Sequence, residues 1–180
     1  TPAQRFGLAD YVPAYPRAAD LGIGRTVHAG EGCPPAEIRL AVERLLAQRI
    51  GHGTTLLDDP HVADLVLERQ IVIEACPTSN VHSGAAASVA EHPIDLLRRL
   101  RFRVTLNTDN RLMSNVSLSS EFAALDEAFG IGLGEMEWLT INTLKSAFAP
   151  FDERLALINE VVKPGYAHLH AEAARVVVAG

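Results

Sequence analysis

The stretch Thr26-Val27-His28-Ala29-Gly30-Glu31 shows the pattern that organises this chain, because it ends a short β-prone run with polar residues and a turn-forming glycine. Three later stretches end β-prone runs in a similar way: Ile50-Gly51-His52-Gly53, Glu74-Ala75-Cys76-Pro77 and Leu106-Asn107-Thr108-Asp109. The spacings are 24, 24 and 33 residues along the series His28, His52, Cys76 and Asp109. A strand, a crossover helix and two short loops need about 25 to 40 residues, so the spacing predicts a βα repeat.

Hydrophobic periodicity predicts the elements of that repeat. Strands are expected at residues 25–29, 49–53, 71–75 and 103–106. Helices are expected at residues 12–21, 36–47, 60–70, 92–100, 117–129, 135–148 and 152–161. Residues 78–90 are rich in Ser, Gly and Ala and are predicted to form an irregular, functional loop. Four strands, each followed by a helix, form either a small open parallel sheet or half of an eight-stranded barrel, because a whole barrel needs about 250 residues.

Composition limits the class of protein. The chain has 180 residues, of which 48% are hydrophobic and 21% charged, as in a soluble globular domain. A net charge of −6 without a long basic cluster argues against a nucleic-acid partner. The apolar runs are too short for a membrane span. Two cysteines, Cys33 and Cys76, offer no disulfide framework, so we predict a cytoplasmic location. The N-terminus shows neither a signal peptide nor an initiating Met, which predicts a truncated or processed chain.

The polar residues at the strand ends predict metal chemistry. In a parallel βα repeat, the carboxyl ends of the strands meet on one rim, so His28, His52 and Asp109 are expected to converge there. Imidazole and carboxylate are ligands that suit zinc and related divalent metals. Glu31 follows His28 by one short turn and is expected to face the same cavity as a proton donor, although a carboxylate at a helix N-terminus needs no further role.

The same motifs, taken in order, carry a resemblance to a known family. The stretches Thr26 to Glu31, Arg49 to Gly53, Cys76-Pro77-Thr78-Ser79-Asn80 and Asn107-Thr108-Asp109-Asn110 resemble the C-terminal half of an adenosine deaminase, of the metal-dependent amidohydrolase group. The string from Asn107 to Ser114 resembles the bacterial, and especially the actinobacterial, branch. The resemblance covers nearly all of residues 5–165.

The resemblance implies a fold, an activity and a role for each matching residue. Residues 1–180 would form one α/β domain, the second half of a (β/α)8 barrel whose N-terminal half is absent. The complete barrel would bind one Zn²⁺ and hydrolyse adenosine or deoxyadenosine to the inosine product and ammonia. His28 and Asp109 would be zinc ligands, and Glu31 would protonate the purine ring. His52 would orient and deprotonate the metal-bound water or stabilise the developing charge, rather than bind the metal as its spacing alone suggests. Asn110, where many family members have a second Asp, would contact the purine.

Two features of the chain limit this implication. The family's other two zinc ligands form a His-x-His pair on its first strand, and no histidine precedes His28. His168 and His170 do form such a pair, but they lie far from any strand end and are not expected to bind metal. We therefore expect the isolated chain to bind zinc weakly and to show little activity. Its expected partners are a purine nucleoside and either the missing half or a second copy.

Alternatives remain for the function and for single residues. The enzyme could deaminate another 6-aminopurine compound, such as adenine or an adenosine-like intermediate. The chain could instead be a non-catalytic half-barrel that self-associates through its sheet edges. Cys76 is expected to be a small buried hydrophobe. Ordinary structural roles are expected for His61, His82 and His92, although His82 in the loop at residues 78–90 could approach a substrate.

Overall fold

A four-stranded parallel sheet forms the centre of the chain in this computed structural model, which describes the backbone of residues 7–179 and the side chains of residues 7–175. Residues 1–6 and 180, part of the domain expected over residues 1–180, lie outside the described residues. The strands are β1 (Thr26–Ala29), β2 (Arg49–His52), β3 (Val72–Ala75) and β4 (Arg103–Leu106). They lie side by side in the order β1-β2-β3-β4, so each of the four strands expected from the sequence is present and pairs with the next in the chain.

The two faces of the sheet differ in chemistry. On one face, the register aligns apolar residues in a row, and all of them are buried: Val27, Ile50, Ile73 and Val104. On the other face, the Thr26 hydroxyl donates a 2.6 Å hydrogen bond to Glu74 Oε2, and Arg49 Nε lies 3.0 Å from Glu74 Oε1. The apolar row is expected to pack on crossover helices, and a polar row is what the interior of a barrel with a strand-end site requires.

Crossover helices join successive strands, as expected for a parallel sheet. They are α2 (Pro35–Glu43), α3 (Pro60–Glu68) and α5 (Ile94–Arg99), and α2 packs against both β1 and α3. The start of α3 is fixed by Asp59, whose carboxylate accepts the backbone N–H groups of His61 and Val62. Proline at the first helical position needs no N–H partner, so Asp59-Pro60 starts this helix where the sequence predicts it.

The segment predicted to be irregular at residues 78–90 is partly ordered, which corrects that prediction. It contains the helix α4 (Pro77–His82) and the short 3₁₀ turn η4 (Val89–Glu91). Pro77 begins α4 immediately after β3, so the helix carries Ser79 and Asn80 back over the end of the sheet. The run Thr78-Ser79-Asn80 concealed this helix because Thr, Ser and Asn have weak helix preference.

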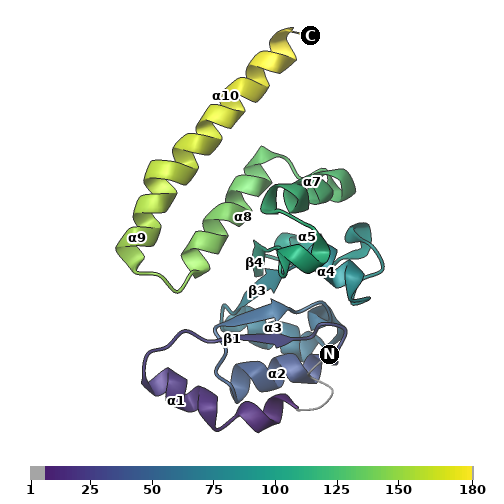
Figure 1. The fold of residues 1–180 in the computed structure, drawn as a ribbon, viewed down its shortest axis with the longest axis vertical. Helices are drawn as coiled ribbons and strands as arrows, with labels where there is room; N and C mark the ends of the chain where they lie inside the picture. The colour runs from purple at the N-terminus through teal and green to yellow at the C-terminus, as the bar shows by residue number, and fades with distance from the viewer. Residues whose placement is uncertain (1–6, 180) are drawn as a thin grey trace.

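The C-terminal third is helical and ends in a long rod. Three helices follow β4: α6 (Arg111–Ser114), α7 (Leu118–Phe129) and α8 (Leu133–Ser146). The helix predicted at residues 152–161 does not stop there, because α9 (Phe151–Ala156), the π-helical segment η5 (Leu157–Val162) and α10 (Lys163–Ala179) form a continuous run that extends away from the sheet (Figure 1). The wider π turn ends two residues before Pro164, which has no N–H to donate and would break a regular helix.

The remaining short elements lie near the N-terminus and after β2. They are η2 (Leu8–Tyr11), α1 (Ala14–Asp20) and η3 (Leu56–Asp58). Within residues 7–179, none of the helices has both the length and the apolar character needed to cross a membrane.

Candidate active site

A cavity of about 170 Å³ opens at the carboxyl ends of the four strands. Its lining residues are His28, Gly51, His52, Glu74, Cys76, Asn107 and Asp109. The structure therefore brings together three residues that the sequence predicts for the site, each at or near the carboxyl end of a different strand. This convergence follows from the parallel order of the strands, since side chains that are far apart in the chain share one edge of the sheet.

The position of His28 depends on the absence of a side chain at Gly51. The two residues are paired in the register of β1 and β2, and a Cβ atom at Gly51 would lie 2.5 Å from His28 Cδ2. The His28 ring therefore packs directly over the glycine. Its centroid lies 4.9 Å from that of the His52 ring, in an edge-to-face arrangement, so two imidazoles share one wall of the cavity.

His52 and Glu31 form the second part of the site. His52 is 2% exposed, and its Nε2 atom lies 3.5 Å from Glu31 Oε2. Burial lowers the pKa of His52 below its ordinary value, although the negative charge of Glu31 acts in the opposite direction. The lowered pKa favours a neutral imidazole at neutral pH. Glu31 follows Gly30, whose φ of +69° and close contact with Ile38 leave no room for a Cβ atom, so the glycine sets the direction of the chain at Glu31.

The Asp109 carboxylate is held by Ser79. Its Oδ2 atom accepts a 2.6 Å hydrogen bond from the Ser79 hydroxyl, and its own backbone has a φ of 55°. His52 has a φ of 72°. Positive φ values are strained for residues other than glycine, and such strain persists only where the surroundings enforce it. Four other described residues also have positive φ, namely Leu46, Gln70, Arg101 and Asn115, so this conformation sets the backbone direction at His52 and Asp109 without being particular to the rim.

Asn80 connects the two catalytic candidates. Its Nδ2 atom lies 3.0 Å from His52 Nδ1 and donates to Glu31 Oε1 at 3.5 Å. Its side-chain oxygen, Oδ1, lies 3.1 Å from His92 Nε2. Asn80 is fully buried and His92 is 3% exposed. Burial lowers the pKa of His92 to about 4, so this imidazole is neutral at pH 7. From the sequence we expected an ordinary structural role for His92, so its contact with the site was missed. The one signal that pointed to this contact region was Asn80, which ends the family-like stretch from Cys76 to Asn80 after β3.

Cys76 lines the cavity as a neutral thiol. Burial raises its pKa to about 12, with nearby carboxylates adding to the shift, so the thiol carries no charge at pH 7. Its Sγ atom lies 3.5 Å from the carbonyl oxygen of Glu74. Both cysteines, Cys33 and Cys76, are free, and the expectation of a small buried hydrophobe fits Cys76.

Asn110 does not line the cavity. It caps α6, with its Oδ1 atom accepting the backbone N–H of Met113 at 3.1 Å, and its side chain is exposed. A role in substrate binding stays a prediction for this residue. His168 and His170 lie on α10, and each is within 4 Å of a glutamate there or on α8 rather than at the strand ends.

The donor set fits a zinc ion only in part. His28 and Asp109 present one imidazole and one carboxylate to the same cavity, which are suitable ligand types for zinc. Among the residues that the structure describes, no group of three or more histidine, cysteine, aspartate or glutamate side chains is arranged to hold a metal ion. A complete metal site would therefore need ligands from outside the described part of the chain.

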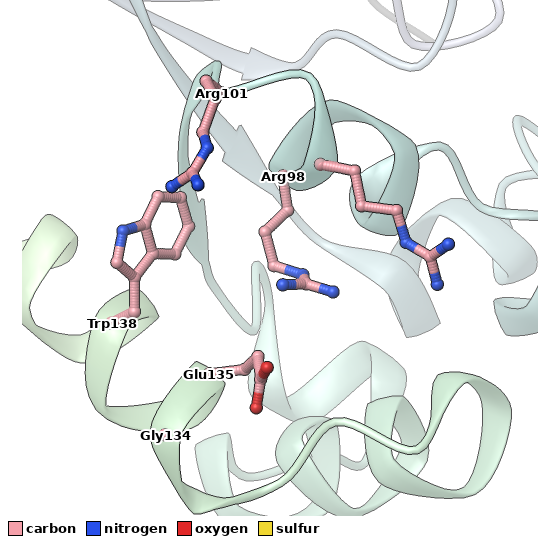
Figure 2. Close-up of a pocket in the computed structure, with 6 residues that line it drawn as sticks. Arg98, Arg101, Gly134, Glu135 and Trp138 are labelled. Atoms are coloured by element: carbon pink, nitrogen blue, oxygen red, sulfur yellow. The ribbon is translucent and has the colours of Figure 1, made fainter.

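A larger cavity, of about 440 Å³, lies on the outer side of the molecule between α5 and α8. Figure 2 shows Arg98 and Arg101 on one wall, opposite Glu135 and Trp138 on α8. The charges are largely balanced, because Asp95 pairs with Arg98 at 2.8 Å and with Arg99 at 2.7 Å and Glu135 adds a second carboxylate. It holds none of the residues predicted for chemistry, so we assign the site to the smaller cavity.

A parallel βα sheet with histidine and aspartate at its strand ends is the arrangement of one half of an amidohydrolase barrel. Comparison of sequences agrees with this class. The sequence model of the family described as adenosine deaminase matches residues 1–164. The chain belongs to the adenosine deaminase family.

Curated relatives are similar over most of this chain but are much longer. Adenosine deaminase 1 of Streptomyces coelicolor is 52% identical over 158 residues, which is 82% of this chain and 40% of that protein. The adenosine deaminase of Mycobacterium tuberculosis is 46% identical over 175 residues, which is 90% of this chain and 48% of the relative. The chain thus spans less than half the length of these relatives.

Solved structures show the same relation. An adenine deaminase from Arthrobacter aurescens superposes with a TM-score of 0.81 at 29% identity, over 85% of this chain and 47% of the other. An amidohydrolase from Burkholderia ambifaria with bound zinc superposes with a TM-score of 0.83 at 26% identity, over 93% and 47%. These neighbours are barrel amidohydrolases, which confirms that the four βα units correspond to half of a (β/α)8 barrel.

Proposed function

We propose that this chain supplies the C-terminal half of a zinc-dependent hydrolase that converts adenosine or deoxyadenosine to the inosine product and ammonia. The observation that carries the proposal is the shared cavity of His28, His52 and Asp109, with Glu31 placed 3.5 Å from His52. The family membership and the names of the curated relatives support the reaction. A cytoplasmic location stays a prediction.

The residues of this chain would act as metal ligands, as a proton donor and as a group that stabilises charge. His28 and Asp109 would provide two zinc ligands, and the Ser79 hydroxyl would hold the Asp109 carboxylate in place. A zinc ion bound there supplies a Lewis acid that makes hydroxide available near neutral pH. Glu31 would donate a proton to the purine ring nitrogen beside the attacked carbon, as the amino group leaves as ammonia. His52 would stabilise charge on the attacking oxygen from its buried position.

Ammonia release from adenosine tests the proposal directly. The complete protein should release ammonia, lose this activity on chelation and recover it with added zinc. Glu31→Gln should abolish turnover, whereas Glu43→Gln on the exposed side of α2 should have no effect. The 180-residue chain alone should bind zinc weakly. Absence of ammonia release by the complete, zinc-loaded protein would refute the proposal.

A second 6-aminopurine substrate is favoured by one observation. The Arthrobacter aurescens neighbour, which superposes with a TM-score of 0.81, is an adenine deaminase. A panel of adenosine, deoxyadenosine, adenine and a phosphorylated adenosine, compared by kcat/KM, would rank these substrates. A preference for adenine above adenosine would replace the first proposal with the second.

The alternative of a self-associating half-barrel is favoured by the sheet order, in which β1 and β4 are the edges of the described sheet. Pairing of these edges with a second copy would cover their free backbone groups. Sedimentation of the isolated chain distinguishes the cases, since a well-behaved monomer excludes pairing and a stable dimer supports it.

A further inference from the structure

A series of hydrogen bonds runs from the start of α5 to the candidate site. Its first member is a backbone N–H group, which can only donate. The backbone N–H of Ile94 donates to His92 Nδ1 at 3.1 Å. A backbone N–H only donates, so His92 Nδ1 is an acceptor and carries no proton. Because His92 is buried and neutral, its single ring proton is on Nε2.

The next link fixes the orientation of the Asn80 amide. His92 Nε2–H faces the Asn80 side chain at 3.1 Å, and only the amide oxygen accepts a hydrogen bond. The Asn80 Oδ1 atom therefore points to His92, and its Nδ2 atom points to the catalytic side. The reverse orientation would place two donors against each other in a buried position and leave both without an acceptor.

The last link determines the tautomer of His52. Asn80 Nδ2 lies 3.0 Å from His52 Nδ1 and 3.5 Å from Glu31 Oε1, and an amide NH₂ offers two protons and no acceptor. His52 Nδ1 is therefore unprotonated, and the proton of the neutral ring is on Nε2. That nitrogen is the one 3.5 Å from Glu31 Oε2.

We propose that Asn80 and His92 are positioning residues that hold neutral His52 in the Nε2–H tautomer, so that His52 donates a hydrogen bond into the cavity and does not take up a proton at Nε2. The second hydrogen bond of Asn80 orients Glu31 from the same side chain. The tautomer follows from the contacts alone, whereas its effect on turnover rests on the proposed function. Between the two roles open to His52, this arrangement selects stabilisation of charge over removal of a proton.

The tautomer can be read without substrate. In the complete protein labelled with ¹⁵N-histidine, nitrogen chemical shifts and couplings should show His52 Nδ1 unprotonated and Nε2 protonated, and the same pattern for His92. Spectra of His52→Gln and His92→Gln assign the two rings. A His52 ring that is protonated on Nδ1, or that averages between both tautomers, would overturn the proposal whether or not the protein releases ammonia.

Variants at Asn80 and His92 test the donor and acceptor assignments along the hydrogen bonds from His92 to His52. Asn80→Asp replaces the donor with an acceptor, so the proton of His52 should move to Nδ1 and kcat should fall about 100-fold with little change in KM, as when tautomer control is lost elsewhere. Asn159→Asp places the same charge on the exposed surface of the π-helical segment η5 and should leave the His52 spectrum and kcat unchanged.

Two substitutions at His92 separate its donor from its bulk. His92→Gln keeps an N–H near the position of Nε2 and should preserve the His52 tautomer, whereas His92→Phe removes the donor, frees Asn80 to rotate and should produce a mixture. A purely structural role predicts that both variants leave the His52 tautomer unchanged. If both rings show the expected tautomers but no ammonia is released from adenosine, the proposed function fails and the positioning role stands.

Discussion

Gly51→Ala should separate the geometry of the site from the stability of the fold. The added Cβ atom would lie 2.5 Å from His28 Cδ2 and 3.3 Å from His28 Nε2. Ordinary carbon–carbon contacts are about 3.5 to 4.0 Å, so the imidazole must move by about 1 Å. Because the ring faces a cavity, it can rotate away without disturbing the core.

The size of each effect follows from this geometry. Overpacking in a core costs about 1 to 3 kcal/mol, and the cost here should lie at the low end because a side chain moves rather than backbone. A displacement of about 1 Å at a reacting centre costs about 100-fold in rate. Zinc affinity should also fall, since His28 is one of the two ligands predicted in this chain.

Steady-state ammonia release, zinc content and urea unfolding of the complete protein measure these three effects. Gly134→Ala is the matched control, since a Cβ atom there meets nothing within 4 Å and the residue lies in a helix, where alanine is favoured. The reasoning is refuted if Gly51→Ala retains normal kcat/KM and zinc content, or if it loses activity only because it unfolds.

Three further outcomes follow from contacts in and near the site. Ser79→Ala removes the 2.6 Å hydrogen bond to Asp109, so zinc affinity measured by competition with a chelator should fall about 10- to 100-fold. Burial holds the pKa of His92 at about 4, below its ordinary 6.5. Between these pH values the unfolded chain binds more protons than the folded chain. The free energy of unfolding should therefore fall by about 3 kcal/mol as the pH drops from 6.5 to 4. Urea unfolding at pH 7 and pH 4.5 should show a smaller loss for His92→Gln than for the parent protein. The fully buried carboxylate of Glu121 accepts the backbone N–H of Thr78 at 3.3 Å, so Glu121→Ala should cost about 2 kcal/mol in the same assay, and an unchanged midpoint would contradict this assignment.

The strands were predictable because each is a short apolar run that ends in a turn former, and parallel pairing leaves few choices of order. The helix over α4 was missed because Ser, Asn and Thr favour caps and turns in isolation, whereas here Pro77 and the end of β3 start a helix. The helix predicted at residues 152–161 was too short, because nothing in the residue pattern shows that a π-helical segment lets the helix continue through Pro164.

The positions of His28, His52 and Asp109 followed from strand-end spacing, since that spacing reports which residues share a rim. The support for these residues was not visible. His92 is 40 positions from His52, and only the fold around α4 shows that Asn80 lies between the two rings. Hydrogen bonds between distant buried side chains leave no periodic trace in a sequence.

The order of the strands has a consequence for how the chain folds. Thr26 pairs with Arg49, Arg49 with Val72 and Val72 with Arg103, so each new strand closes a short loop onto the strand just before it. The entropic cost of closure is therefore similar at each step, and the sheet can grow in one direction as the chain is synthesised. In a closed barrel the last pairing joins partners that are far apart in the chain. We expect that step, rather than the growth of this half, to limit the rate of folding.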